Sequence, residues 1–249
     1  MKIKKILVSQ PEPSSDKNPY AEVAEKNNVK IEFRQFIHVE PVTTKDFRRQ
    51  RVSLLDFTAV IFTSKTAIDH YFRIAADVRI VVPDTMKYFC TSESIAHYLQ
   101  KYIVYRKRKI FYASGKFQDL MELLEKHKEE KYLVPLSEQH KEEIPRLLDK
   151  HKVKHKIAIL YQTVSSDLSD LSMINYDVLV FFSPSGIRSL FSNFPDFDQK
   201  DIKIASFGNS TAQAVRDAGL RLDLAAPMPN APSMTMALDQ FIQEHNKKK

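Results

Sequence analysis

Hydroxyl side chains follow several short apolar runs of this 249-residue sequence. The segments 182–187 (FSPSGI) and 207–212 (FGNSTA) each lie between such a run and a stretch with helical spacing of apolar residues. A helix N-terminus carries unsatisfied N–H groups and partial positive charge, so hydroxyls and amides there can hold a carboxylate or a phosphate. The alternative is that they only cap their helices, a role that favours Ser and Thr. Four such clusters in duplicated positions favour anion binding for the set.

Tyr161 is a second candidate for chemistry. It ends an apolar strand predicted over 157–160 and opens a polar turn predicted over 162–164, where we expect two halves of the chain to join. A phenol at such a junction can reach a ligand. The alternative is an aromatic ring that packs the hinge.

Several other kinds of site lack their sequence signals. No glycine pattern matches a dinucleotide loop or a phosphate-binding P-loop, and no Gly-x-Ser-x-Gly elbow is present. The eight histidines show no metal-ligand spacing. Half of them fall in Lys- and Glu-rich stretches typical of solvated helix faces, namely His127, His140, His151 and His155. We therefore expect no metal site.

The elements that carry these residues occur twice in the chain. Segment 57–68 aligns without a gap on segment 176–187, at an offset of 119 residues (187 − 68). Segment 88–96 answers 205–213 at an offset of 117 (211 − 94). In both pairs a buried strand feeds a helix through a short turn rich in Ser or Thr. The sequence therefore predicts a duplicated strand and helix unit.

A third pair makes the first copy discontinuous. Segment 6–31 parallels segment 132–154 at an offset of 124 (153 − 29), although it stands at the chain start. The chain must then leave the first lobe, complete the second and return. The expected bounds are residues 1–37 with 163–249 for lobe one, and residues 38–162 for lobe two.

The two crossings between lobes are expected at 36–42 and 157–164, which are both extended and apolar. Side by side they would form a short antiparallel connector. With only four glycines in the chain, no Gly/Ser-rich linker is present. The strand and helix alternation predicts an α/β fold with open, mostly parallel sheets covered by helices on both faces, which bind ligands at the carboxyl ends of their strands.

The overall composition is that of a globular protein, with 43% hydrophobic and 28% charged residues. The N-terminal apolar run is too short for a signal peptide, and nowhere do about 18 apolar residues follow one another. The single cysteine, Cys90, has no partner for an internal disulfide. These features predict a cytoplasmic protein.

A net charge of +7 fits nucleic acid, a membrane surface or an anionic small molecule as partner. The basic runs at 106–109, 150–156 and 247–249 are scattered rather than placed along one helix. We interpret them mostly as solvated surface and expect neither a nucleic acid nor a membrane partner. A basic cleft for a polycarboxylate stays compatible with the remaining excess.

The order and spacing of these motifs resemble the uroporphyrinogen-III synthase family. The resemblance rests on segments 62–68, 161–163, 182–186 and 207–212, the last followed by 218–220, and it runs through almost the full length. It implies two flavodoxin-like lobes joined by a two-stranded antiparallel connector. The implied ligand is the linear tetrapyrrole hydroxymethylbilane, bound between the lobes.

The activity that the resemblance implies is a dehydrating cyclisation. The substrate's hydroxyl leaves as water, an azafulvene cation forms, ring D is attacked at its substituted position through a spiro intermediate, and uroporphyrinogen III closes with that ring inverted. The resemblance implies no metal and no organic cofactor, and we expect a monomer. The alternatives are a non-catalytic tetrapyrrole-binding or regulatory protein with the same fold and a basic nucleic-acid-binding protein.

The resemblance also implies roles for individual residues. Tyr161 corresponds to the tyrosine proposed to assist departure of the hydroxyl, and Thr211 to a threonine of the cleft. Gln10 stands where family members commonly have arginine, and Thr91 replaces an expected glycine. Lys65 is a residue to which part of the substrate grip can be redistributed. The substrate-binding residues expected on this basis are Gln10, Ser64, Lys65, Ser94, Ser183, Ser185, Gly186, Asn209, Ser210 and Thr211.

Overall fold

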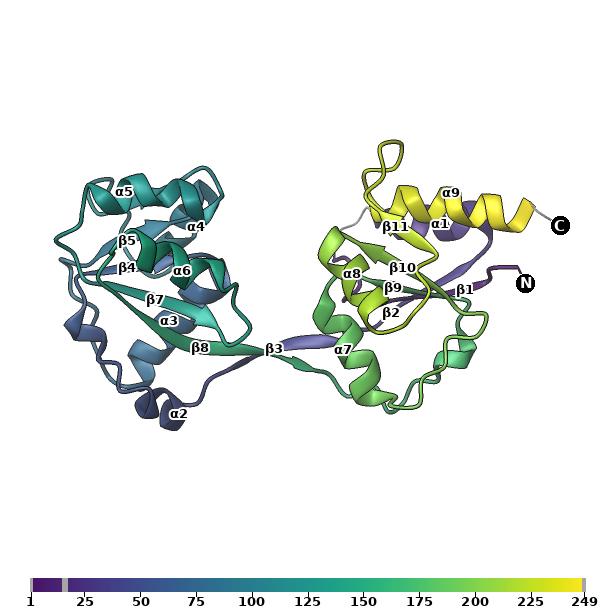
Figure 1. The fold of residues 1–249 in the computed structure, drawn as a ribbon, viewed down its shortest axis with the longest axis horizontal. Coiled ribbons are helices and arrows are strands. Elements are labelled where there is room, and N and C mark those ends of the chain that lie inside the picture. The colour runs from purple at the N-terminus through teal and green to yellow at the C-terminus, as the bar shows by residue number, and fades with distance from the viewer. Residues whose placement is uncertain (1, 15–17, 248–249) are drawn as a thin grey trace. The chain divides into compact units, whose positions relative to one another are not determined.

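The computed structural model describes residues 2–14 and 18–247 and divides into two compact units (Figure 1). Unit 1 consists of Met1–His38 and Val164–Lys249, and unit 2 of Val39–Thr163. Unit 1 is thus built from both ends of the chain, and unit 2 from its middle.

The core of unit 1 is a five-stranded parallel sheet in the order β11-β10-β9-β1-β2. Numbered by their sequence within the unit, its strands follow the order 2-1-3-4-5, which is that of a flavodoxin-like sheet. The central strands are continuous apolar runs because both faces of the sheet are covered. The strands are β1 (Lys5–Val8), β2 (Lys30–Phe33), β9 (Val178–Phe181), β10 (Lys203–Phe207) and β11 (Leu224–Ala226).

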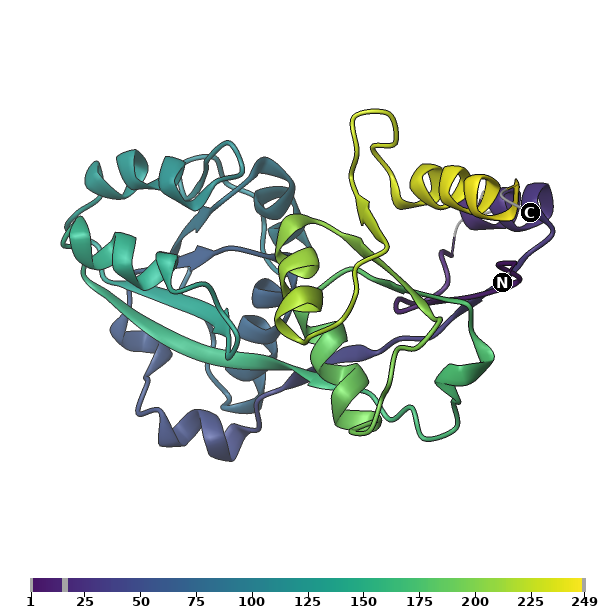
Figure 2. The ribbon, with the colours of Figure 1, turned by 45° about the vertical axis from the view of Figure 1, so that its right-hand side comes forward.

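Alternate residues of these strands build two separate cores. Ile6 and Val8 pack with residues of α1 (Pro19–Asn27) and α9 (Met234–Lys247), whereas Leu7 packs with the other face. Figures 1 and 2 show α1 and α9 side by side over one face of the sheet. The opposite face is covered by η4 (Met173–Asn175), α7 (Pro184–Asn193) and α8 (Asn209–Asp217).

Unit 2 repeats this arrangement with a cyclic shift of the chain. Its sheet has the order β3-β8-β7-β4-β5-β6, and without β3 its strands, numbered within the unit, read 5-4-1-2-3. Strands β1 and β2 therefore occupy the places of β7 and β8, as the third repeated pair predicts. The strands are β3 (Ile37–Pro41), β4 (Ala59–Phe62), β5 (Lys87–Cys90), β6 (Ile110–Tyr112), β7 (Tyr132–Ser137) and β8 (His155–Ser165).

Helices again cover both faces of the unit 2 sheet. Val60 and Phe62 point to the core shared with α2, α3 and α4, and Ala59 and Ile61 to the core shared with α5 and α6. The helices are α2 (Thr44–Arg49), α3 (Lys65–Asp77), α4 (Glu93–Tyr98), α5 (Met121–Glu125) and α6 (Glu143–Lys150), with short 3-10 turns η1 (Leu54–Asp56), η2 (Leu99–Lys101) and η3 (Phe117–Leu120).

The first repeated pair is confirmed in detail. Strands β4 and β9 begin at residues 59 and 178, and helices α3 and α7 at residues 65 and 184, so both pairs keep the offset of 119. The residues before the helices are Ser64 and Ser183, both with extended backbones. Each accepts a hydrogen bond from the backbone N–H three residues later.

Strands β3 and β8 are neighbours in the sheet. Val42 N donates to Leu160 O over 2.9 Å, and Ser166 N donates to Phe36 O over 2.9 Å. The partner numbers run in opposite directions, as in antiparallel pairing. The predicted polar turn over 162–164 is wrong, because β8 continues through these residues to Ser165. The extended crossing expected at 157–164 lies within β8.

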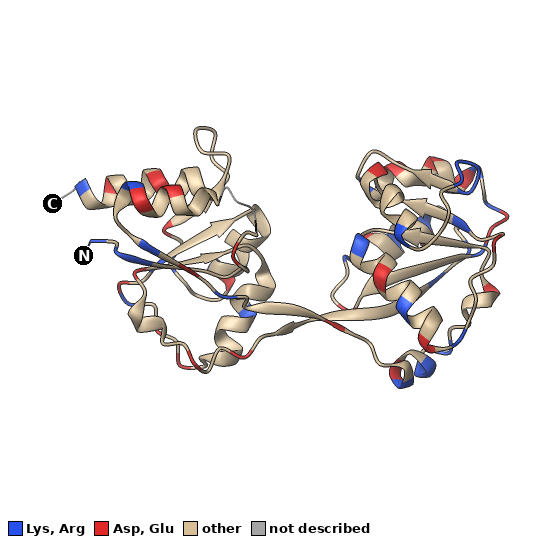
Figure 3. Cartoon of the chain, turned by 180° about the vertical axis from the view of Figure 1, so that it is seen from behind, with Lys and Arg blue, Asp and Glu red and all other residues tan. Residues whose placement is uncertain are grey.

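Charge is distributed over both units. Figure 3 shows Lys and Arg interspersed with Asp and Glu along the elements of each. Across the described part of the chain, every helix is too short or too polar to cross a bilayer.

Candidate functional site

In a doubly covered parallel sheet, ligands bind outside the carboxyl ends of the strands, where the strand order reverses. In unit 1 this place lies between β1 and β9, whose register pairs Val8 with Val180. Ser9 continues this register, since its N–H donates to Val180 O over 3.0 Å. Gln10 follows Ser9 and is exposed, and Ser183 follows β9. The expected residues at these two strand ends are therefore brought to one edge.

Gly186 allows α7 to begin very close to that edge. A Cβ there would lie 3.3 Å from the Phe181 ring, 3.7 Å from Ser183 Oγ and 3.8 Å from Ser9 Oγ. Gly186 N donates to Ser183 Oγ over 3.2 Å, so Ser183 does cap the helix. A serine that accepts this bond still has its O–H to donate. The capping and binding interpretations are thus compatible at Ser183.

Ser185 is hydrogen-bonded to a cationic side chain, Arg188, that the sequence analysis did not single out. Arg188 Nη2 donates to Ser185 Oγ over 2.6 Å, and the arginine is exposed. The spacing of Ser185 and Arg188 could have indicated this contact, because residues three apart on a helix are neighbours. The first turn of α7 therefore combines backbone N–H groups, two serines and a guanidinium.

The second expected cluster of unit 1 lies at the start of α8. Gly208 precedes the helix with φ of +87°, a left-handed value that glycine adopts without strain. Its N–H donates to Ala226 O over 2.7 Å, which ties the turn to β11. Asn209 and Ser210 are exposed, but Thr211 is 1% exposed. Within unit 1, Thr211 is thus an interior residue and is not brought to the surface with its two neighbours.

In unit 2 the structure brings Tyr161 and Ser64 together. Tyr161 Oη lies 3.2 Å from Ser64 Oγ, and Ser64 Oγ accepts from Ala67 N over 3.0 Å. Tyr161 belongs to β8 and Ser64 caps α3, two elements that are far apart in sequence. One serine therefore joins the start of a helix to the phenol.

His70, also missed by the sequence reasoning, holds the tyrosine ring. The His70 and Tyr161 rings stack with centroids 5.0 Å apart and planes 17° from parallel. Arg73, one turn further along α3, donates to Val42 O over 2.9 Å. Helix α3 thereby holds Tyr161 from its flank and is itself tied to the chain beside β3.

The environment keeps the phenol protonated. Tyr161 is 9% exposed, and burial raises its pKa although the hydrogen bond with Ser64 acts in the opposite direction. A tyrosine has an ordinary pKa of about 10, so a raised value leaves the group neutral near pH 7. It can therefore donate a proton or a hydrogen bond.

Tyr161 forms part of the wall of a pocket of about 530 Å³ within unit 2. Thr63, Thr91 and Ser137 also line it, and each follows or ends a strand of the sheet. The pocket therefore lies at the carboxyl edge, where such a fold binds ligands. Thr91, the departure from the family pattern, is 6% exposed at this edge. The charged or titratable residues of its lining are Lys116, His140, Lys141 and Glu143. We call this cavity the Tyr161 pocket.

Lys65 and Ser94 are exposed residues at the starts of α3 and α4. The ammonium of Lys65 lies 5.4 Å from the centroid of the Tyr98 ring. Neither Lys65 nor Ser94 lines the Tyr161 pocket. The structure therefore does not bring these two expected residues together with the phenol at this cavity.

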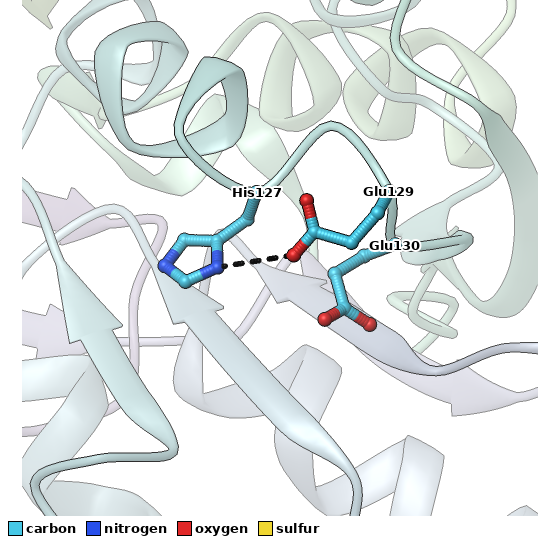
Figure 4. A group of neighbouring side chains, drawn as sticks. All are labelled: His127, Glu129 and Glu130. Atoms are coloured by element: carbon cyan, nitrogen blue, oxygen red, sulfur yellow. Dashed lines mark ion pairs between the residues drawn. The ribbon is translucent and has the colours of Figure 1, made fainter.

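One cluster in unit 2 has metal-ligand side chains: His127, Glu129 and Glu130, with their ligand atoms within 4.8 Å of one another (Figure 4). Its histidine Nδ1 lies 3.7 Å from Glu129 Oε1. Lys87 Nζ lies 2.5 Å from Glu130 Oε1 and 4.0 Å from Glu129 Oε1. Burial raises the pKa of Glu130, but hydrogen bonds led by that of Lys87 outweigh it and the pKa is lowered. The lysine already supplies the balancing cation, so we interpret the cluster as an ion network.

Comparison with solved structures supports the fold. A mutant uroporphyrinogen III synthase from the extremely thermophilic bacterium Thermus thermophilus matches with a TM-score of 0.57 and 13% identity, over 99% of this chain and 100% of that one. The uroporphyrinogen-III synthetase of Helicobacter pylori 26695 matches with a TM-score of 0.58 and 16% identity, over 97% and 100% of the two chains. No curated protein matches the sequence.

A model of one protein family matches most of the chain. Its description is uroporphyrinogen-III synthase HemD, and the match covers residues 18–236. The match includes the Tyr161 pocket and the carboxyl ends of β2, β9, β10 and β11, whereas β1 and Gln10 precede it. The chain therefore belongs to the uroporphyrinogen-III synthase family, the enzymes that act on a tetrapyrrole in porphyrin and heme biosynthesis.

Proposed function

We propose that this protein catalyses the dehydrating cyclisation of hydroxymethylbilane to uroporphyrinogen III, with inversion of ring D. The observation that carries the proposal is the phenol of Tyr161, which is kept protonated in the wall of a pocket at a carboxyl edge of the sheet. We also propose that the enzyme is a cytoplasmic monomer that uses no metal, organic cofactor, nucleic acid or membrane.

We propose that Tyr161 assists the first step, the loss of the substrate's hydroxyl as water. Ser64 Oγ accepts from Ala67 N and can donate its own hydrogen to Tyr161 Oη. The phenol hydrogen is then free to point at the leaving oxygen. Hydrogen bonds in such a chain strengthen one another. A donor at the leaving hydroxyl lowers the barrier to forming the azafulvene cation.

The carboxylates of the substrate need hydrogen-bond donors rather than strong bases. The beginnings of α7 and α8 present N–H groups together with Ser183, Ser185, Asn209 and Ser210. Hydrogen bonds to a carboxylate are charge-assisted and stronger than neutral ones. Because the cationic intermediate is reactive by itself, the protein mainly has to fold the linear substrate and position ring D. We propose that these groups at the beginnings of α7 and α8 hold the substrate carboxylates and thereby fold the substrate and position ring D.

The test supplies hydroxymethylbilane, generated in place, to the purified protein and separates the oxidised products into isomers I and III. A protein-free reaction, which gives isomer I, is the control. Dominant isomer III is the expected result. Isomer I alone would refute the proposed reaction and favour a non-catalytic tetrapyrrole-binding role for the same fold.

A further inference from the structure

The Tyr161 pocket contains two cationic side chains that neither the repeats nor the motifs single out. Lys116 and Lys141 line it, both are exposed, and neither forms an ion pair with any residue in the described ranges. Each reaches the pocket from a different loop, Lys116 after β6 and Lys141 after β7. Two ammonium groups in the lining of one pocket, neither of them in an ion pair in the described ranges, favour an anionic ligand.

The loop that carries Lys141 is fastened beside the phenol. Glu138 N donates to Tyr161 O over 2.9 Å, and Thr163 N donates to Gln139 Oε1 over 2.9 Å. Gln139 and Tyr161 both line the pocket. The loop therefore keeps a defined place next to β8 before any ligand arrives, which lowers the ordering cost of binding.

The remaining titratable groups of the pocket limit the kind of ligand. His140 Nδ1 lies 2.9 Å from Ser137 O, and a carbonyl only accepts, so this nitrogen carries a hydrogen. Glu143 is the carboxylate of the lining and opposes an anion. The positive side chains outnumber the negative one, and the rest of the lining combines polar groups with the apolar Phe117, Leu136 and Ile144. This lining fits carboxylates attached to a partly apolar body.

We propose that Lys116 and Lys141 bind neighbouring carboxylates of the tetrapyrrole and thereby place the ring that carries them beside Tyr161. The inference rests on the proposed function for the substrate class and extends it to two residues outside the recognised motifs. Ammonium groups suit this task because they grip carboxylates as point charges on flexible stems.

The direct test is equilibrium binding of uroporphyrin III, a stable polycarboxylate, followed by its fluorescence. The variant Lys116→Gln/Lys141→Gln should bind about tenfold more weakly, the loss expected for two exposed ion pairs near the upper end of their usual strength. The matched control Lys107→Gln/Lys126→Gln removes the same charge from exposed positions of unit 2 outside this pocket. It should bind like the unchanged protein.

A substitution that removes a negative charge separates an electrostatic effect on binding from a structural one. Glu143→Gln removes the opposing carboxylate and should tighten binding by about twofold, within the usual range of an exposed pair. In the cyclisation assay, Lys116→Gln/Lys141→Gln should raise KM far more than it lowers kcat, and Lys116→Arg/Lys141→Arg should keep most of the affinity. Equal porphyrin affinity in the two double Gln variants, or no porphyrin binding by the unchanged protein, would overturn the inference. A third outcome is that the unchanged protein yields isomer I alone but still needs both lysines to bind porphyrin. That outcome would refute only the proposed reaction.

Discussion

The substitution Tyr161→Phe removes one oxygen atom from the candidate site and leaves the ring in place. Its ring stacks on His70 and is 9% exposed, so phenylalanine fills nearly the same volume. The lost interaction is the 3.2 Å hydrogen bond with Ser64 Oγ. Ser64 keeps the bond from Ala67 N and is not left without a partner.

The expected loss of stability follows from that single contact. A net intramolecular hydrogen bond contributes about 0.5–1.5 kcal/mol, and a bond of 3.2 Å belongs at the lower end. We therefore expect the free energy of unfolding to fall by about 0.5–1 kcal/mol. Urea denaturation of the variant and the unchanged protein measures this difference.

The expected loss of activity is much larger. A positioned proton donor contributes about 10²–10⁴-fold to a rate, so kcat for isomer III should fall by at least about a hundredfold. The assay times the appearance of isomer III from hydroxymethylbilane, with Tyr112→Phe as a matched control on an exposed tyrosine of unit 2 that does not line the pocket. A kcat for Tyr161→Phe equal to that of Tyr112→Phe would refute the proton-donor role. The role would also be refuted if the free energy of unfolding fell by as much as the free energy that corresponds to the whole loss of kcat.

Three further outcomes are expected. Ser64→Ala and Ser183→Ala remove equivalent helix caps and should each cost about 1 kcal/mol in urea denaturation, but only Ser64→Ala should be non-additive with Tyr161→Phe in a double-mutant cycle. Cys90 is 0% exposed and burial raises the pKa of its thiol to about 12, so a thiol-specific dye should react at pH 8 only after unfolding, and rapid native labelling would contradict this. A hydrogen bond from Lys30, the largest of several causes, lowers the pKa of Glu32 from 4.5 to about 2, so its stabilising effect is present above about pH 4.5 and is lost as the pH falls toward 2. Glu32→Gln should therefore reduce the fall of the urea midpoint between about pH 4.5 and pH 2. An unchanged fall would show that other groups cause it.

Much of the fold follows from patterns that are local in the chain. The run at 59–62 and its copy at 178–181 are apolar on every residue, which marks strands buried on both faces. Ser64 and Ser183 mark the starts of the following helices through the same capping preference. Because the chain is duplicated, each copy supports the interpretation of the other. The discontinuous first copy also implies the cyclic shift of strand order between the units.

Sequence reasoning was less informative where a residue's role depends on its spatial neighbours. The turn predicted after Tyr161 is absent because pairing with β3 extends β8 to Ser165. The expected binding group at the start of α8 divides into two exposed residues and the interior Thr211. Helical phase decides this division, and it depends on which face of α8 packs against the sheet.

The sequence by itself indicated the family and the repeated strand and helix unit and singled out Tyr161 as a candidate, because these inferences depend on residue type and spacing along the chain. Only the tertiary structure placed Ser64 and His70 against that phenol. It also brought Lys116 and Lys141 from two loops to one pocket. Contacts between distant segments depend on strand order and register, and the carboxyl edge of a parallel sheet gathers residues whose sequence positions carry no mark of their proximity.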